Sequence, residues 1–341
     1  MRWISIIALS MSLSVVACAG STEVPASEED DLTAVFASPG PDLGRTTHVI
    51  ADLDGSATFA VYDRALERRA EGKVEPIANL DGGYAGLVVA KDFVAVLTSS
   101  YVPNGNKTVL HFYARAAGWK ETEVDLSSDR QTFRHPITIL EDESVAVGNG
   151  EDLFVVKASG AIAKLGGATS ALAGGEIDKI YASGDAKHPY VVLASGATFD
   201  VDTKAKRETP LAKLETGFSP TRLFHAGTKT WITTDFEGVK VFGLDGKLLR
   251  KADLVTPKGR YITTAALLGD EILTVQQSER SKERTVLARY TVATLARTEV
   301  GTFDGVIGQL SPTKSQLFFT FSPKGAAGFN SRVYYAHALR L

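Results

Sequence analysis

The 341-residue sequence predicts an all-β fold built from repeated units, and three observations support this prediction. From about residue 32 onward, short runs of β-branched and aromatic residues alternate with clusters of Gly, Asp, Asn, Ser and Pro, as strands alternate with turns. No helical periodicity extends beyond two turns, with residues 64–71 as the one candidate helix. The third observation is that the same order of strands and turns recurs along the chain.

The repeated unit consists of three apolar strands and a polar hairpin that leads into a fourth strand. Its clearest copy runs through residues 220–226, 229–235 and 239–250. First strands begin near residues 85, 136, 177, 220, 261 and 305, so the intervals are 41 to 51 residues, and four-stranded propeller blades repeat every 40 to 50 residues or so. One more unit precedes residue 85, with strands at 47–52, 58–63 and 74–80. The sequence therefore predicts a β-propeller, most simply one of seven four-stranded blades, with a pair of β-sandwiches as the rival fold.

The two ends of the repeat region raise the question of how the ring closes. The last unit lacks a fourth strand, and an isolated strand-like run, Leu-Thr-Ala-Val-Phe-Ala, occupies residues 32–37. This run either opens the first blade or completes the last one. We expect the second arrangement, because a ring closed by an N-terminal strand leaves no free sheet edge.

Residues 32–341 resemble the broad superfamily of WD-repeat, YVTN-repeat and quinoprotein-like propellers. The resemblance lies in the length of the repeat and in its alternation of short apolar strands with turn residues. No unit carries the paired Gly-His and Trp-Asp signature of WD repeats, or the Trp-bearing motif of quinone-binding blades. The resemblance therefore implies a fold and transfers no functional residue.

The N-terminus has the pattern of an export signal. After Arg2, residues 3–17 carry no charge, and in a helix they would span about 22 Å, short of a bilayer core of roughly 30 Å. Val15-Val16-Ala17-Cys18 resembles the lipobox of bacterial lipoproteins, which implies a lipid on Cys18, the sole cysteine. The alternative is an ordinary secretory signal cleaved near Ala17 or Ala19. By resemblance to enterobacterial sorting, Ala19 favours the outer membrane over the inner one.

The expected organisation is a signal peptide at 1–17, a lipidated flexible tether at 18–31 and a propeller domain at 32–341. Residues 19–31 contain five carboxylates and one large apolar side chain, too little to offset the entropy of ordering. Removal of the signal peptide changes the net charge from −3 to −4, because Arg2 is lost. This balance gives no reason to expect a nucleic-acid partner. The expected partners are the membrane, through the lipid on Cys18, and an envelope protein or glycan.

Motifs for catalysis and metal binding are weak. The six histidines show no metal-ligand spacing, and His135, just before an expected strand, is the one that we would test. Acidic segments at 52–55, 149–152 and 235–238 are better explained as hairpin turns than as calcium loops. The sequence contains neither GxSxG nor a phosphate-binding loop. We therefore expect no metal, no cofactor and no enzymatic activity.

The remaining candidate is one face of the disc. Loops between blades and loops between second and third strands emerge on the same side of a propeller, and here they are rich in aromatic residues and arginine, as protein-binding hot spots are. The candidate binding residues on these loops are Tyr84, Tyr101, Phe133, Arg134, Phe218, Phe236, Arg260, Tyr261, Arg280, Arg284 and Phe329. The favoured hypothesis is a non-enzymatic binding module. The alternative is a propeller hydrolase or lyase with a metal in the central channel, which requires at least three converging carboxylate, Asn or His side chains at the channel mouth.

Overall fold

A computed structural model describes residues 37–40, 42–70, 72–129, 132, 134–166, 170–183, 188–213, 222–225, 230–235, 238–253, 260–278, 284–325 and 334–340. All of them belong to one compact unit that spans residues 35–341. The predicted signal peptide, lipobox and tether lie outside the described residues.

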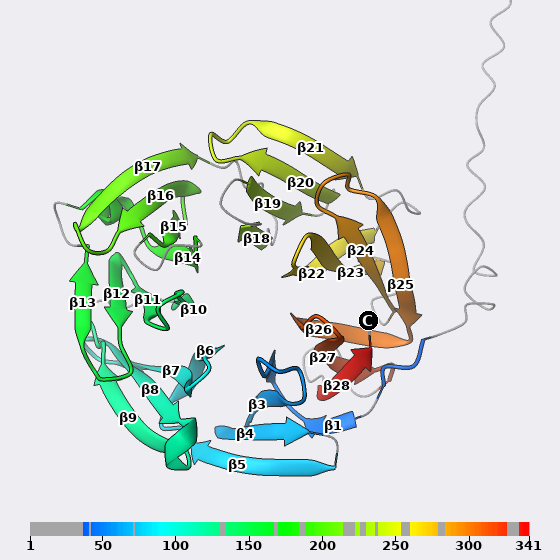
Figure 1. Cartoon of the computed structure of the whole chain (residues 1–341), viewed down its shortest axis with the longest axis horizontal. Coiled ribbons are helices and arrows are strands. Elements are labelled where there is room, and N and C mark those ends of the chain that lie inside the picture. The colour runs from blue at the N-terminus through cyan, green and yellow to red at the C-terminus, as the bar shows by residue number, and fades with distance from the viewer. Residues whose placement is uncertain are drawn as a thin grey trace, which may run out of the picture. The chain divides into compact units, whose positions relative to one another are not determined.

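The described strands form seven four-stranded antiparallel sheets, which are the blades of a β-propeller (Figure 1). Blades 1 to 3 are β2 (His48–Ala51), β3 (Thr58–Tyr62), β4 (Ala65–Ala70) and β5 (Lys73–Asn79); β6 (Gly83–Val89), β7 (Phe93–Val102), β8 (Gly105–Ala114) and β9 (Lys120–Asp125); and β10 (Ile137–Ile139), β11 (Val145–Asn149), β12 (Asp152–Val156) and β13 (Ile162–Leu165). Blades 4 and 5 are β14 (Ile177–Tyr181), β15 (Tyr190–Leu193), β16 (Ala197–Asp202) and β17 (Arg207–Lys213); and β18 (Arg222–His225), β19 (Thr230–Asp235), β20 (Gly238–Gly243) and β21 (Leu248–Asp253).

Blade 6 contains β22 (Arg260–Leu268), β23 (Glu271–Ser278), β24 (Thr285–Thr291) and β25 (Arg297–Phe303), and blade 7 contains β26 (Gly305–Pro312), β27 (Gln316–Pro323), β28 (Tyr335–Arg340) and β1 (Asp42–Arg45). The described helices are the short 3-10 segments η2 (Arg115–Ala117) and η3 (Ala171–Gly174). The prediction of a seven-bladed propeller is confirmed. The first strand of every predicted unit begins within two residues of the position expected from the repeat.

The ring closes through an N-terminal strand, as expected, but the segment differs from the predicted one. The strand that completes blade 7 is β1, which pairs with β28 through Asp42 opposite His337 and Arg45 opposite Tyr335. In the predicted run 32–37, Ala37 is described and lies outside any strand, and the other five residues lie outside the described part of the chain. The sequence Asp-Leu-Gly-Arg of β1 buries only Leu43, so it lacks the apolar alternation by which strands are recognised.

The candidate helix at 64–71 is wrong, because residues 65–70 form strand β4. Leu66 is fully buried against blade 2, and Arg69 is buried with its guanidinium paired to Glu67. Arg68 likewise pairs with Asp52, so ion pairs hold both arginines of this strand in the sheet.

The hydrophobic core is divided among the contacts between neighbouring blades. One cluster joins Leu97 and Leu110 of blade 2 to Val145 and Val147 of blade 3, and another joins Phe59 of blade 1 to blade 2. Each sheet is therefore covered on both faces by its neighbours, and the blades depend on one another for burial of apolar surface.

Candidate functional site

The strand ends that flank the predicted binding loops lie on one face of the disc. Strands alternate in direction within each blade, so the loops that follow second and fourth strands lie on the same side. The structure places Tyr84 at the start of β6, Tyr101 at the end of β7, Arg134 before β10, Tyr261 in β22 and Arg284 before β24. Arg260 is described only as part of the backbone of β22. The other candidates, Phe133, Phe218, Phe236, Arg280 and Phe329, lie outside the described residues.

The described candidates differ in what they offer to a partner. Tyr84 is half-buried and stacks on His48 with ring centroids 4.0 Å apart. Arg134 pairs with Asp178 at 2.7 Å, and Arg284 lies 3.7 Å from Asp304. These side chains belong to different blades, so the structure brings them to one face without gathering them into one cluster.

Tyr101 stands out because 61% of its surface is exposed, the largest exposure of any aromatic side chain in the described part of the chain. It lies near the tip of the β7–β8 hairpin, whose two strands have ten residues each, beside the exposed Val102. Asn106, which lies opposite Tyr101 in this hairpin, is fixed to the next loop by two backbone hydrogen bonds with Ser128, of 3.0 and 3.1 Å. The hairpin therefore presents an apolar tip on a rigid support.

A cavity of about 840 Å³ lies on the opposite face of the disc, where the innermost strands of several blades end. Apolar side chains of β2, β6, β10 and β22, such as Ile50, Leu87, Ile139 and Leu267, contribute to its wall. The described carboxylates at this mouth are Asp52 and Asp54, in the loop between β2 and β3. The described residues thus bring together two carboxylates here, fewer than the three groups that the channel-metal alternative requires.

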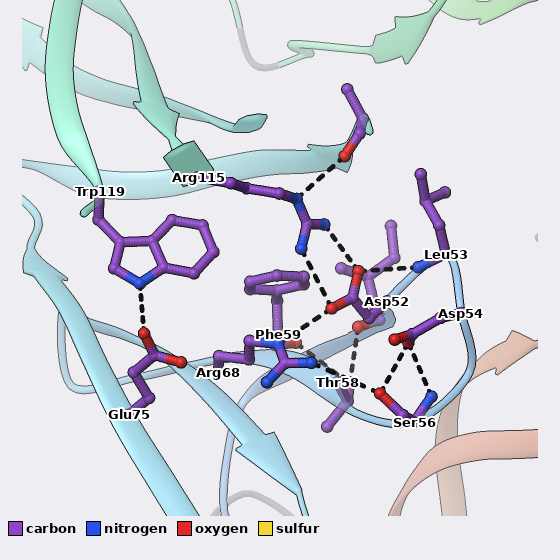
Figure 2. A network of polar contacts seen from close by, with 12 residues as sticks. Asp52, Leu53, Asp54, Ser56, Thr58, Phe59, Arg68, Glu75, Arg115 and Trp119 are labelled. Atoms are coloured by element: carbon purple, nitrogen blue, oxygen red, sulfur yellow. Dashed lines mark hydrogen bonds and ion pairs between the residues drawn. The ribbon is translucent and has the colours of Figure 1, made fainter. Parts of the chain in front are cut away.

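Asp52 is engaged in a network that joins blades 1 and 2 (Figure 2). Its Oδ1 lies 2.6 Å from Arg115 Nη2, and its Oδ2 accepts a 3.0 Å hydrogen bond from Arg68 Nε. The backbone amide of Leu53 also donates to Oδ1 at 2.8 Å. Burial by itself raises the pKa of Asp52, but the hydrogen bonds from Arg115, Arg68 and Leu53 outweigh it and lower the pKa. Both carboxylate oxygens are occupied, so this group serves as a brace between blades.

The same network contains two aromatic rings. Arg115 lies over Phe59 of blade 1 and over Trp119 at the end of the β8–β9 connection, with distances of 5.2 and 5.8 Å to the ring centroids. Trp119 Nε1 donates a 2.6 Å hydrogen bond to Glu75 on β5 (Figure 2).

The acidic segment 52–55, predicted to be a turn, is a turn whose Asp52 braces two blades. The segment 149–152 is likewise a tight hairpin in which Asn149 pairs with Asp152, and Asp235 pairs with Gly238.

His135, the histidine that we would test, lies just before β10 and is half-buried. Its Nε2 is 3.4 Å from Asn106 Nδ2. Burial lowers the pKa of His135, and the nearby Glu176 opposes this effect. It does not line the cavity between the inner strands.

Sequence reasoning missed one group of potential ligands, formed by His111 on β8 with Glu121 and Glu123 on β9. Within the described ranges it is the one set of three His, Cys, Asp or Glu residues placed to hold a metal ion. Glu121 and Glu123 follow His111 by 10 and 12 positions in the sequence. The three meet because the register of the β8–β9 hairpin places His111 opposite Glu123. The signal that could have found them is the alternation of Glu121 and Glu123, which places both on one face of a strand.

No family model and no curated protein sequence matches the chain. Among the described residues, no helix is both long enough and apolar enough to cross a bilayer.

Proposed function

We propose that this chain is a non-enzymatic lipoprotein of the bacterial cell envelope whose β-propeller binds another envelope protein or a glycan. The observation that carries the binding role is the β7–β8 hairpin. It exposes Tyr101 and Val102 on the face where the loops after second and fourth strands lie. The sequence Val15-Val16-Ala17-Cys18 supports the lipid anchor, and the outer membrane is the expected location.

The physical chemistry of the hairpin suits a contact surface. A tyrosine combines a large apolar ring with a hydroxyl that donates and accepts hydrogen bonds, and ordering it costs little rotamer entropy. The pairing of Asn106 with Ser128 holds the hairpin in place before any partner arrives, which lowers the entropy cost of binding. The buried Asn106 side chain adds a 2.8 Å hydrogen bond to the Thr132 carbonyl.

Crosslinking and pull-down from intact envelopes test the binding role. The comparison is between wild type and Tyr101→Ala, alone and together with Phe133→Ala. We expect the captured partner to be lost from the Tyr101 variants, because the exposed ring is removed while the hairpin stays paired. The matched control is Val74→Ala on β5, which removes a side chain of similar exposure, 60%, from the outer edge of blade 1. An unchanged partner in the Tyr101 variants would contradict the proposal.

The anchor is tested separately by growing cells with a palmitate analogue that can be tagged. We expect label on the wild-type chain and none on Cys18→Ser, which also should leave the membrane fraction. A wild-type chain without label, or a labelled Cys18→Ser chain, would show that the lipid assignment is wrong.

A further inference from the structure

His111, Glu121 and Glu123 form a compact group on the outer strands of blade 2. Their ligand atoms all lie within 4.8 Å of one another. The Nδ1 atom of His111 is 2.8 Å from Oε1 of Glu121 and 3.6 Å from Oε1 of Glu123. Ligands at about 2.0–2.1 Å from a tetrahedral Zn²⁺ stand about 3.3 Å apart, so these separations need only small side-chain adjustments.

The imidazole of His111 is already oriented for such a role. The ring is buried, and its Nε2 atom lies 2.9 Å from Oγ1 of the buried Thr98. Thr98 Oγ1 is also 3.5 Å from the Val109 carbonyl, so the hydroxyl can donate there and accept from Nε2–H. In that arrangement Nδ1 turns its lone pair toward the two carboxylates. A hydrogen bond at the other ring nitrogen is the usual support of a metal-binding histidine.

His111 Nδ1 faces the two carboxylates either with a proton, which it donates to Glu121 Oε1, or with a lone pair that a metal ion can use. The carboxylates are free to adjust, because the side chains of Glu121 and Glu123 are 42% and 62% exposed. Glu121 is additionally positioned by a 2.9 Å hydrogen bond from the Tyr113 hydroxyl.

The group borders a cavity that leaves room for further ligands. This cavity measures about 310 Å³ and is lined by His111 and Glu123 together with Asp81, Thr98, Ser100 and Asp125. Asp81 and Asp125 add negative charge, and Lys107 is the cation on the same wall. Water, or a donor group of a bound molecule, can therefore complete the coordination of an ion held by three protein ligands.

We propose that His111, Glu121 and Glu123 bind a first-row divalent transition-metal ion such as Zn²⁺. One imidazole nitrogen with two carboxylates is a donor set that suits zinc and its neighbours. Ca²⁺ and Mg²⁺ prefer all-oxygen sites, so they bind here far more weakly. The site lies at the outer strands of blade 2, and it is independent of the proposed contact through Tyr101.

Calorimetric titration with Zn²⁺ tests the site, using the untagged full chain in detergent after treatment with a chelator. We expect one ion to bind at the site in the wild type, and Glu123→Gln to weaken binding about tenfold or more, as does His111→Gln. Glu123→Gln changes an exposed side chain, so the fold is expected to persist, which circular dichroism checks. Cys18 is present in every variant, so the differences report on the proposed ligands.

The matched control is Asp125→Asn, which removes the same charge from the same face of β9 without removing a proposed ligand. We expect it to change the affinity by less than about twofold, because Asp125 adds an exposed charge to the neighbouring cavity without being one of the three ligands. Absence of Zn²⁺ binding in the wild type, or equal affinities of wild type and Glu123→Gln, would overturn the proposal. A tenfold effect of Asp125→Asn would reduce the site to a diffuse acidic surface, and binding of Ca²⁺ as tight as that of Zn²⁺ would show that the histidine is not a ligand.

Discussion

The Nη1 atom of Arg69 in β4 donates a 2.6 Å hydrogen bond to the backbone carbonyl of Arg45 in β1. Arg69 belongs to blade 1, whereas β1 is the strand that completes blade 7. The guanidinium is buried and pairs with Glu67 at 2.7 Å. One side chain thus fastens the closing strand to the next blade.

Replacement of this guanidinium tests the fastening of the ring. Arg69→Met keeps an apolar stem but leaves Glu67 without its cation and the Arg45 carbonyl without its donor. Breaking a buried pair in this way costs about 3 kcal/mol of unfolding free energy, which urea denaturation measures. Arg250→Met, on the exposed strand β21, is the control and should change the unfolding free energy by less than about 0.5 kcal/mol. Equal effects of the two substitutions would mean that Arg69 has no special role in closure.

Asp52→Asn tests the brace between blades 1 and 2. The substitution leaves Arg68 and Arg115 facing a neutral amide, so we expect a loss of about 3 kcal/mol near neutral pH. Because the folded state lowers the pKa of Asp52, its contribution is complete above the unfolded value of 3.8 and is lost as the pH falls through the folded pKa. The difference between wild type and variant, measured by urea unfolding, should therefore shrink below pH 3.8.

The control for this prediction is Asp54→Asn, two residues along the same loop. Asp54 is exposed and accepts hydrogen bonds only locally, from the amide and hydroxyl of Ser56 at 2.9 and 2.8 Å. We expect Asp54→Asn to change the unfolding free energy by less than about 0.5 kcal/mol at neutral pH. A difference between wild type and Asp52→Asn that stays constant down to low pH would contradict the role assigned to the Asp52 carboxylate.

The repeat made most of the fold predictable, whereas the exceptions depend on contacts between distant residues. First strands such as β14 and β26 are recognisable because a turn precedes each apolar run and the period fixes their positions. The closing strand β1 owes its stability to its neighbours β28 and Arg69 and not to its own composition. The strand β4 escaped recognition for a related reason, since Arg69 and Glu67 satisfy each other inside the structure.

The candidate sites were less predictable than the fold. Loop connectivity placed Tyr84 and Tyr101 on one face, but their exposure depends on packing, because Tyr84 stacks on His48 whereas Tyr101 lies exposed near the tip of a long hairpin. The group around His111 depends on the pairing of β8 with β9. A search for metal ligands at fixed spacings along the sequence cannot detect ligands that meet across a hairpin.

The geometry of the β7–β8 hairpin is tested at Gly105, which has a positive φ of 141°. A Cβ atom at this position would lie 2.0 Å from the carbonyl oxygen of Ser128, a backbone atom that is fixed by its pairing with Asn106. We therefore expect Gly105→Ala to cost 2–3 kcal/mol or so of unfolding free energy and to speed hydrogen exchange of the Asn106 amide. Gly72→Ala is the control, since a Cβ there meets nothing within 4 Å and only the φ of 67° opposes it, at about 1 kcal/mol. Equal costs at the two glycines would mean that the tip of the hairpin is not constrained by Ser128.

The His48 ring offers a test of pH dependence near neutrality. Val49 N–H donates to Gln309 Oε1 at 3.0 Å, which turns the Gln309 amide nitrogen toward His48 Nδ1, 2.9 Å away. Burial lowers the pKa of His48 below its usual 6.5. The unfolded chain therefore takes up a proton first on acidification, and the folded state loses stability as the pH falls through 6.5 toward the lower folded pKa.

We expect the urea midpoint of the wild type to fall as the pH is lowered through this range, and His48→Gln to remove part of that fall. Glutamine is neutral at every pH in the range, and its amide can still meet Gln309. Burial also lowers the pKa of His135, so some dependence on pH should remain in the variant. A direct NMR titration of the His48 ring provides the second measurement. A midpoint of protonation at 6.5 in the folded chain would make the slopes of wild type and variant coincide, and a midpoint above 6.5 would make acidification stabilise the wild type relative to the variant. Either result would contradict the prediction.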